Sequence, residues 1–135
     1  MEDMYINHLA VIVAAVASFA VGALWYGPPL FFNAWKKANG LTDEDLARAN
    51  PVRNYGISFI LALIICYNLA FFLSDADTDW VWGATAGLLA GFGWAAAAFM
   101  TIALYEMRSM KYILINVGYI IVYFTLAGFI IGIWR

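Results

Sequence analysis

Apolar residues gather in four continuous blocks along the chain, at about residues 8–27, 55–73, 80–105 and 112–134. Each block has close to the ~20 apolar residues that an α-helix needs to cross the ~30 Å hydrocarbon core of a bilayer. The blocks are unbroken runs and not ten-residue alternations of apolar and polar residues, which argues against a β-barrel. The pattern predicts an all-α fold: a four-transmembrane-helix bundle that forms a single integral membrane domain over residues 1–135.

The composition requires lipid as the solvent of much of the surface. Apolar residues make up 65% of the chain and charged residues 12%, whereas soluble domains carry about 25% charged residues. A globule of 135 residues cannot bury that much apolar surface, so membrane lipid is the first expected partner. A net charge of −2 gives no footprint for nucleic acid. Glu2 and Asp3 stand where a signal peptide would carry bases, so we expect a retained first span.

The bases predict how the chain threads through the membrane. They are Lys36, Lys37, Arg48 and Arg53 in loop 28–54, with Arg108 and Lys111 in the third loop. The second loop holds three Asp and no Lys or Arg. Because cytoplasmic loops carry the excess of bases, loops one and three are expected in the cytoplasm. Both termini then lie outside.

Loop 28–54 is the one long polar segment, and its sequence predicts local structure. Pro28 should end the first span, because proline cannot continue the hydrogen-bond ladder. Residues 30–39 mix aromatic residues with two lysines, which suits a short interfacial helix, and Gly40 is a candidate cap at its end. Thr42 should cap a second short helix that Pro51 ends. The loop is either a docking surface for a cytoplasmic protein partner or a structured connector.

Small residues form stripes on three of the four spans. In a membrane, helices associate by close backbone packing, which small residues permit. The predicted helix-packing residues are Ala14, Ser18 and Gly22 in the first span, Gly83, Gly87, Gly91 and Ala95 in the third, and Gly128 and Gly132 in the fourth. A bundle of four helices has few internal interfaces, so three small-residue stripes are more than its own packing requires. We therefore expect at least one stripe to serve a homo-oligomer.

A few polar side chains inside the spans allow two interpretations. Asn68 lies on the second span, while Asn116, Tyr119 and Tyr123 share one side of the fourth. Trp94 stands on the small face of the third span. These five residues are a candidate polar pocket or path. The alternative is interhelical hydrogen bonding, which contributes about 0.6 to 2 kcal/mol per bond in membranes.

Ionisable chemistry is missing from the spans. No Asp, Glu, Lys or Arg lies deep in any block, whereas ion and proton pathways are usually marked by such residues. His8 is the only histidine and Cys66 the only cysteine, and neither has neighbours in sequence that complete a metal or nucleophile site. No catalytic motif is present. We therefore expect no enzyme activity, no cofactor and no metal.

Several short stretches carry a resemblance to a known family. They are Ile6-Asn7, Leu9-Ala10, the run GALWYGP at 22–28, Phe32-Asn33-Ala34-Trp35-Lys36 and Gly40-Leu41-Thr42, with Gly118-Tyr119, Gly128, Gly132 and Trp134 further on. With these the chain resembles domain of unknown function 1761, a family of small membrane proteins of bacteria and fungi. His8 departs from the resemblance, which would place an aromatic residue there. The resemblance implies a four-span fold and no particular chemistry.

These observations lead to two hypotheses for function. The first is an oligomer-forming binding or scaffold module that uses loop 28–54 as its cytoplasmic contact surface. The second is a small channel or facilitator for an uncharged solute, built within or between protomers. We expect the protein in the bacterial inner (plasma) membrane.

Overall fold

The computed structural model describes residues 6–135, so Glu2 and Asp3, on which the expectation of a retained first span partly rests, lie outside the described part. Every regular element within residues 6–135 is a helix. The elements are α1 (His8–Trp25), α2 (Phe32–Ala38), α3 (Asp43–Ala47), α4 (Pro51–Phe72), α5 (Trp80–Ala90), η1 (Gly91–Ala96), α6 (Ala97–Tyr105) and α7 (Met110–Ile133). Elements α5, η1 and α6 run on as one rod. Within that described part, four helical rods are long and apolar enough to cross a membrane: α1, α4, the composite rod and α7.

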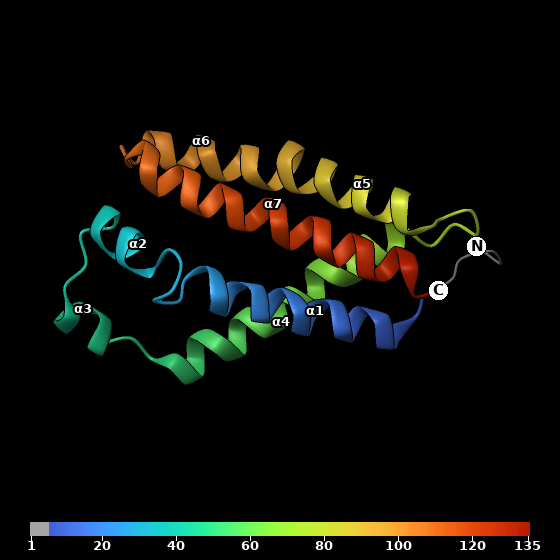
Figure 1. Ribbon diagram of the computed structural model, residues 1–135, viewed down its shortest axis with the longest axis horizontal. Helices are drawn as coiled ribbons and strands as arrows, with labels where there is room; N and C mark the ends of the chain where they lie inside the picture. Colours follow the sequence, from blue (N-terminus) through green and yellow to red (C-terminus); the bar gives the residue numbers. More distant parts are fainter. Residues whose placement is uncertain (1–5) are drawn as a thin grey trace.

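Helix α7 is the centre of the bundle. The α5–η1–α6 rod packs along one side of it, and α1 packs along the other, with α4 beyond α1 (Figure 1). The start of α1 and the end of α7 lie together at one end of the bundle, and α2 and α3 lie at the opposite end (Figure 1). Every membrane-length rod therefore contacts α7.

The second span begins earlier than the sequence pattern indicated. The sequence pattern predicts a start near residue 55 and a stop of the preceding helix at Asn50 and Pro51. Instead, α3 already ends at Ala47, and the Asn50 side chain accepts a hydrogen bond from the Arg53 amide at 3.1 Å to cap α4. Proline is well suited to the first position of a helix, because its missing N–H would have no partner there. The connector shortens to residues 26–50 as a result.

The caps predicted in the connector are confirmed. Gly40 ends α2 with a φ of +67°, and the Leu41 amide returns to the Lys36 carbonyl at 3.1 Å. This is a Schellman turn, which favours glycine because the left-handed backbone strains other residues. Thr42 caps α3 and exchanges hydrogen bonds with Asp45. Hydrogen bonds from the Thr42 amide and hydroxyl hold the pKa of Asp45 below its usual range.

The glycine stripes of the third and fourth spans face each other inside one protomer. A Cβ placed on Gly83 would overlap the Gly128 carbonyl oxygen, and one placed on Gly87 would overlap the Phe124 carbonyl oxygen. A Cβ on Gly132 would sit 2.5 Å from the Asp79 oxygen. Helices α5 and α7 thus touch backbone to backbone along what we call the glycine seam, formed by Gly83, Gly87, Gly128 and Gly132.

The third span departs from α-helical register at η1, which is a π-helical segment. We predicted that Ala95 continues the stripe of Gly83, Gly87 and Gly91. Ala95 is only half-buried, and Ala96 is the residue with 0% exposure. A π turn holds more residues than an α turn, so the inward position moves by one residue. The predicted place of Ala95 is therefore wrong by one position.

Candidate binding cavity

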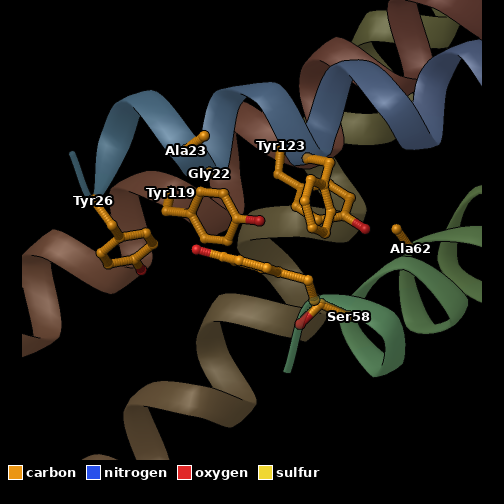
Figure 2. Close-up of a pocket in the computed structure, with 9 residues that line it drawn as sticks. Gly22, Ala23, Tyr26, Ser58, Ala62, Tyr119 and Tyr123 are labelled. Carbon is orange, nitrogen blue, oxygen red and sulfur yellow. The ribbon is translucent and has the colours of Figure 1, made fainter. Parts of the chain in front are cut away.

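A cavity of about 340 Å³ lies between α1, α4 and α7, toward the end of α1 (Figure 2). Its lining residues are Phe19, Gly22, Ala23 and Tyr26 from the α1 side, Tyr55, Ser58 and Ala62 from α4, and Tyr119 and Tyr123 from α7. We call it the tyrosine cavity. No charged side chain lines it.

Three tyrosine rings follow one another along the cavity (Figure 2). The ring of Tyr119 stands edge-on to Tyr26 at 5.2 Å between centroids and edge-on to Tyr123 at 5.5 Å. Tyr119 and Tyr123 are four residues apart on α7, so they project from the same side of that helix. Gly22 leaves room for the first of them, because a Cβ at that position would come within 3.1 Å of the Tyr119 hydroxyl.

The tyrosine hydroxyl groups of the cavity differ in whether they have a hydrogen-bond partner in the protein. Tyr26 donates to the Asn116 side-chain oxygen at 2.5 Å, and the Asn116 amide donates to the Tyr112 carbonyl at 2.9 Å. The Tyr119 hydroxyl makes no hydrogen bond to any of residues 6–135. The Tyr123 hydroxyl is enclosed and has no partner among them either. Buried hydroxyls are usually hydrogen-bonded, so the enclosed Tyr123 hydroxyl is an exception. The Tyr119 hydroxyl is not enclosed, so it is the group that a ligand atom in the cavity can reach.

An aromatic clamp fixes the end of α1 beside the cavity. The Trp25 indole nitrogen donates to the Ile115 carbonyl at 2.8 Å. The ring also lies over Gly118, where a Cβ would come within 2.7 Å of the indole, and it packs on Phe31 at 4.9 Å. The clamp sets the position along α7 at which Tyr26 makes its contacts. The run containing Trp25-Tyr26 and the pair Gly118-Tyr119 were both present in the family resemblance, but the sequence did not show that they touch.

The α4 wall of the cavity is loosely held. All residues from 51 to 58 are exposed, whereas the buried residues of α4 begin at Ala62. The contacts near Tyr55 are edge-on aromatic ones, with Phe19 lying 5.7 Å from Tyr55 and 6.3 Å from Phe59. The cavity therefore has a rim between α1 and the first half of α4.

The far end of the cavity is closed by a packed core. Beyond Tyr123 the space between the three helices is filled by buried side chains, namely Val11, Ala14 and Ala15 of α1, Ala62, Cys66, Leu69 and Ala70 of α4, and Ala127 and Ile131 of α7. Ser18, also fully buried, donates to the Ala14 carbonyl at 2.8 Å. The predicted packing positions of the first span, Ala14 and Ser18, thus lie inside the protomer, and Gly22 lies at the cavity.

The candidate polar pocket predicted from the sequence does not form as a unit. Tyr119 and Tyr123 line the cavity, and Asn116 is joined to it through Tyr26. Asn68 is exposed and donates to the Ile64 carbonyl at 2.8 Å, and Trp94 is 65% exposed beside Phe72. An amide in a helix can satisfy its N–H on its own preceding turn, so a polar residue in a span need not face inward.

The α1 wall of the cavity was missed by the sequence interpretation. Phe19, Ala23 and Tyr26 carry no polar pattern that separates them from lipid-facing residues, and Gly22 was assigned to helix packing. The one sequence feature that could have indicated this wall is the Trp25-Tyr26 pair, but such a pair is equally consistent with the membrane–water interface and with the bundle interior.

Comparison with known proteins gives one match. A family model described as "Protein of unknown function (DUF1761)" matches residues 9–132. Neither a curated protein nor a solved structure matches the chain.

Proposed function

We propose, for a chain that belongs to the DUF1761 family of proteins of unknown function, a role as a membrane-embedded binding protein. Its site is the tyrosine cavity, and its ligand is an uncharged molecule that is soluble in the membrane. The observation that carries this proposal is a cavity walled by apolar and aromatic side chains, in which the Tyr119 hydroxyl is accessible and has no hydrogen-bond partner among residues 6–135. A mostly apolar concavity with a few convergent polar groups is the usual form of a small-molecule site.

The closed end of the cavity supports binding over passage. A facilitator for an uncharged solute needs a continuous path, and the core around Cys66 and Ala127 fills the space beyond Tyr123. Opening that path would separate side chains that are buried against one another, which forfeits their dispersion contacts. The facilitator hypothesis therefore has less support than the binding hypothesis.

Two proposals about macromolecular partners stand beside this one. A homo-oligomer would need a surface other than the glycine seam, because α7 covers Gly83 and Gly87. A cytoplasmic protein partner at loop 28–54 would meet a surface whose Lys36 and Arg48 pair with Asp43 and Asp45. Neither proposal has a structural feature as specific as the tyrosine cavity.

Topology gives a first test. We propose both termini outside, the connector with α2 at the cytoplasmic face, and the bacterial inner (plasma) membrane as the location. In a Cys66→Ala background, Asp77→Cys should react with a membrane-impermeant maleimide in intact cells, whereas Asn33→Cys should react only after permeabilisation. Both positions are exposed, and Asn33 lies on α2 whereas Asp77 lies between α4 and α5. The reverse pattern of labelling would overturn the orientation.

Occupancy of the cavity gives the second test. Ala23 lines the cavity and is exposed, so Ala23→Phe should fill the space without disturbing buried packing. We expect an aliphatic diazirine alcohol, photo-activated in nanodiscs, to label peptides containing Tyr26 and Tyr55 in the wild type. Labelling of these peptides should fall about fivefold in the variant, because a phenyl ring excludes the probe.

The matched control is Ala20→Phe. Ala20 is also exposed on α1 but does not line the cavity, so this variant should label like the wild type. Equal labelling of all lipid-facing peptides, with no effect of Ala23→Phe, would contradict a binding function for the cavity.

A further inference from the structure

The walls and the hydroxyls of the tyrosine cavity point together to one class of ligand. We infer that the cavity binds a planar, uncharged carbonyl compound with an apolar tail, which is the chemistry of a quinone. This inference rests on the proposed binding function and names its ligand class. The lining carries no Asp, Glu, His, Lys or Arg, and the inference concerns binding and includes no redox step.

Aromatic rings make up most of the cavity wall. Of the nine lining residues, five are aromatic: Phe19, Tyr26, Tyr55, Tyr119 and Tyr123. Aromatic rings prefer offset-stacked or edge-to-face contacts with other rings, and the rings of Tyr26, Tyr119 and Tyr123 already meet one another edge-on. A planar ring fits such walls better than a flexible acyl chain, which would lose its rotational freedom there.

The tyrosine hydroxyls provide donors for a carbonyl oxygen. Tyr26 is already engaged with Asn116 at 2.5 Å, so the lining tyrosines without a hydrogen bond to any described residue are Tyr55, Tyr119 and Tyr123. Tyr123 is 8% exposed, and its hydroxyl has no partner among residues 6–135. Leaving a hydroxyl without a partner in an apolar setting is costly. The Tyr123 hydroxyl is enclosed, so a ligand in the cavity reaches the Tyr119 hydroxyl instead, and a carbonyl oxygen there supplies the acceptor that Tyr119 lacks.

The size and position of the cavity indicate where the apolar tail of the ligand lies. A volume of about 340 Å³ is near the lower limit of small-molecule sites, so it holds a ring and not a whole lipid. Ala23, Tyr55 and Ser58 line the cavity and are exposed, which places its rim between α1 and the first half of α4. The tail leaves through that rim into the surrounding lipid.

The chain carries its own reporter for a binding assay. Cys66 is the only cysteine and has 0% exposure, so a fluorogenic maleimide reacts with it only when the bundle opens. A bound ligand raises the temperature of that opening by mass action. Decylubiquinone is a suitable probe because its ring is fully substituted and cannot alkylate the thiol. Two matched compounds separate its features: decylbenzene has a ring without a carbonyl, and monodecanoylglycerol has a carbonyl without a ring.

We expect decylubiquinone to raise the opening temperature of the wild type at concentrations about tenfold lower than either matched compound. Tyr119→Phe keeps the ring and removes the donor that the cavity exposes, so it should weaken decylubiquinone binding about tenfold and leave decylbenzene unchanged. Tyr105→Phe, at an exposed tyrosine away from the cavity, should change neither.

The alternative outcomes separate this inference from the proposed function. Preference for monodecanoylglycerol would identify a glycerolipid site and overturn the ring assignment while the binding function stands. Equal binding of all three compounds, or no effect of Tyr119→Phe, would overturn the carbonyl assignment in the same way. If no compound raises the opening temperature and Ala23→Phe leaves photolabelling unchanged, the binding function itself fails.

Discussion

Gly87→Ala is expected to lower the free energy of unfolding by about 3 kcal/mol, the upper part of the range for overpacking a close contact. The added Cβ would overlap the Phe124 carbonyl oxygen and come within 3.1 Å of the Thr125 Cα. These are backbone atoms, so no side-chain rotation relieves the overlap and α5 must move away from α7. Opening of the bundle, followed through the Cys66 thiol in detergent or nanodiscs, measures the loss.

Gly93→Ala is the matched control for this prediction. Gly93 lies in the same rod, and a Cβ there would meet no atom within 4 Å. Alanine is favoured over glycine in helices by up to about 1 kcal/mol, so this variant should be neutral or slightly more stable. Equal stability of the Gly87 and Gly93 variants would contradict the glycine seam. A change of oligomer mass in native mass spectrometry without a loss of stability would instead return Gly87 to an interface between protomers, where the sequence led us to expect it.

Trp25→Ala is expected to cost about 2 kcal/mol, below the usual 3–5 kcal/mol for truncating a buried aromatic residue because Trp25 is only half-buried. The variant loses the hydrogen bond of 2.8 Å to the Ile115 carbonyl and the ring that covers Gly118. It should also weaken the contact between Tyr26 and Asn116, because the end of α1 is no longer held at a fixed depth. Stability is measured through Cys66, and photolabelling of the cavity should fall as well.

Trp94→Ala provides the comparison for Trp25. Trp94 is 65% exposed and contacts the Phe72 ring at 5.8 Å, so its truncation in lipid should cost less than about 1 kcal/mol. Trp25→Phe retains an aromatic ring without the indole donor and should fall between the two. If Trp25→Ala and Trp94→Ala are equally mild, the aromatic clamp does not hold α1 against α7.

The glycine seam changes how the small-residue stripes are understood. From the sequence, the stripes exceeded what four helices need, and an oligomer followed. In the structure, Gly83 and Gly87 meet Gly128 and its neighbours, so two stripes account for each other in a single interface. The small-residue stripe of the first span has two roles: Ala14 lies in the packed core, and Gly22 lies at the cavity. A count of stripes cannot separate contacts within a chain from contacts between chains, because both need the same close approach.

The sequence by itself determined the features that depend on local chemistry. In lipid every backbone polar group must be satisfied within its own segment, so four long apolar runs predict four helices, as the structure has them. Gly40 and Thr42 act within one or two turns of chain, and their caps were predictable for that reason. The asparagine before Pro51 was misjudged because the same pair can end one helix or begin the next.

Only the tertiary structure decided which faces meet. Helix rotation is set by packing over the whole length of two neighbours, and one π turn at η1 is enough to move the inward position from Ala95 to Ala96. Tyr26 and Tyr119 are far apart in the sequence and become wall neighbours through the Trp25 clamp and the space at Gly22. The tyrosine cavity exists because three helices converge on those contacts, and no single helix carries a pattern that encodes it.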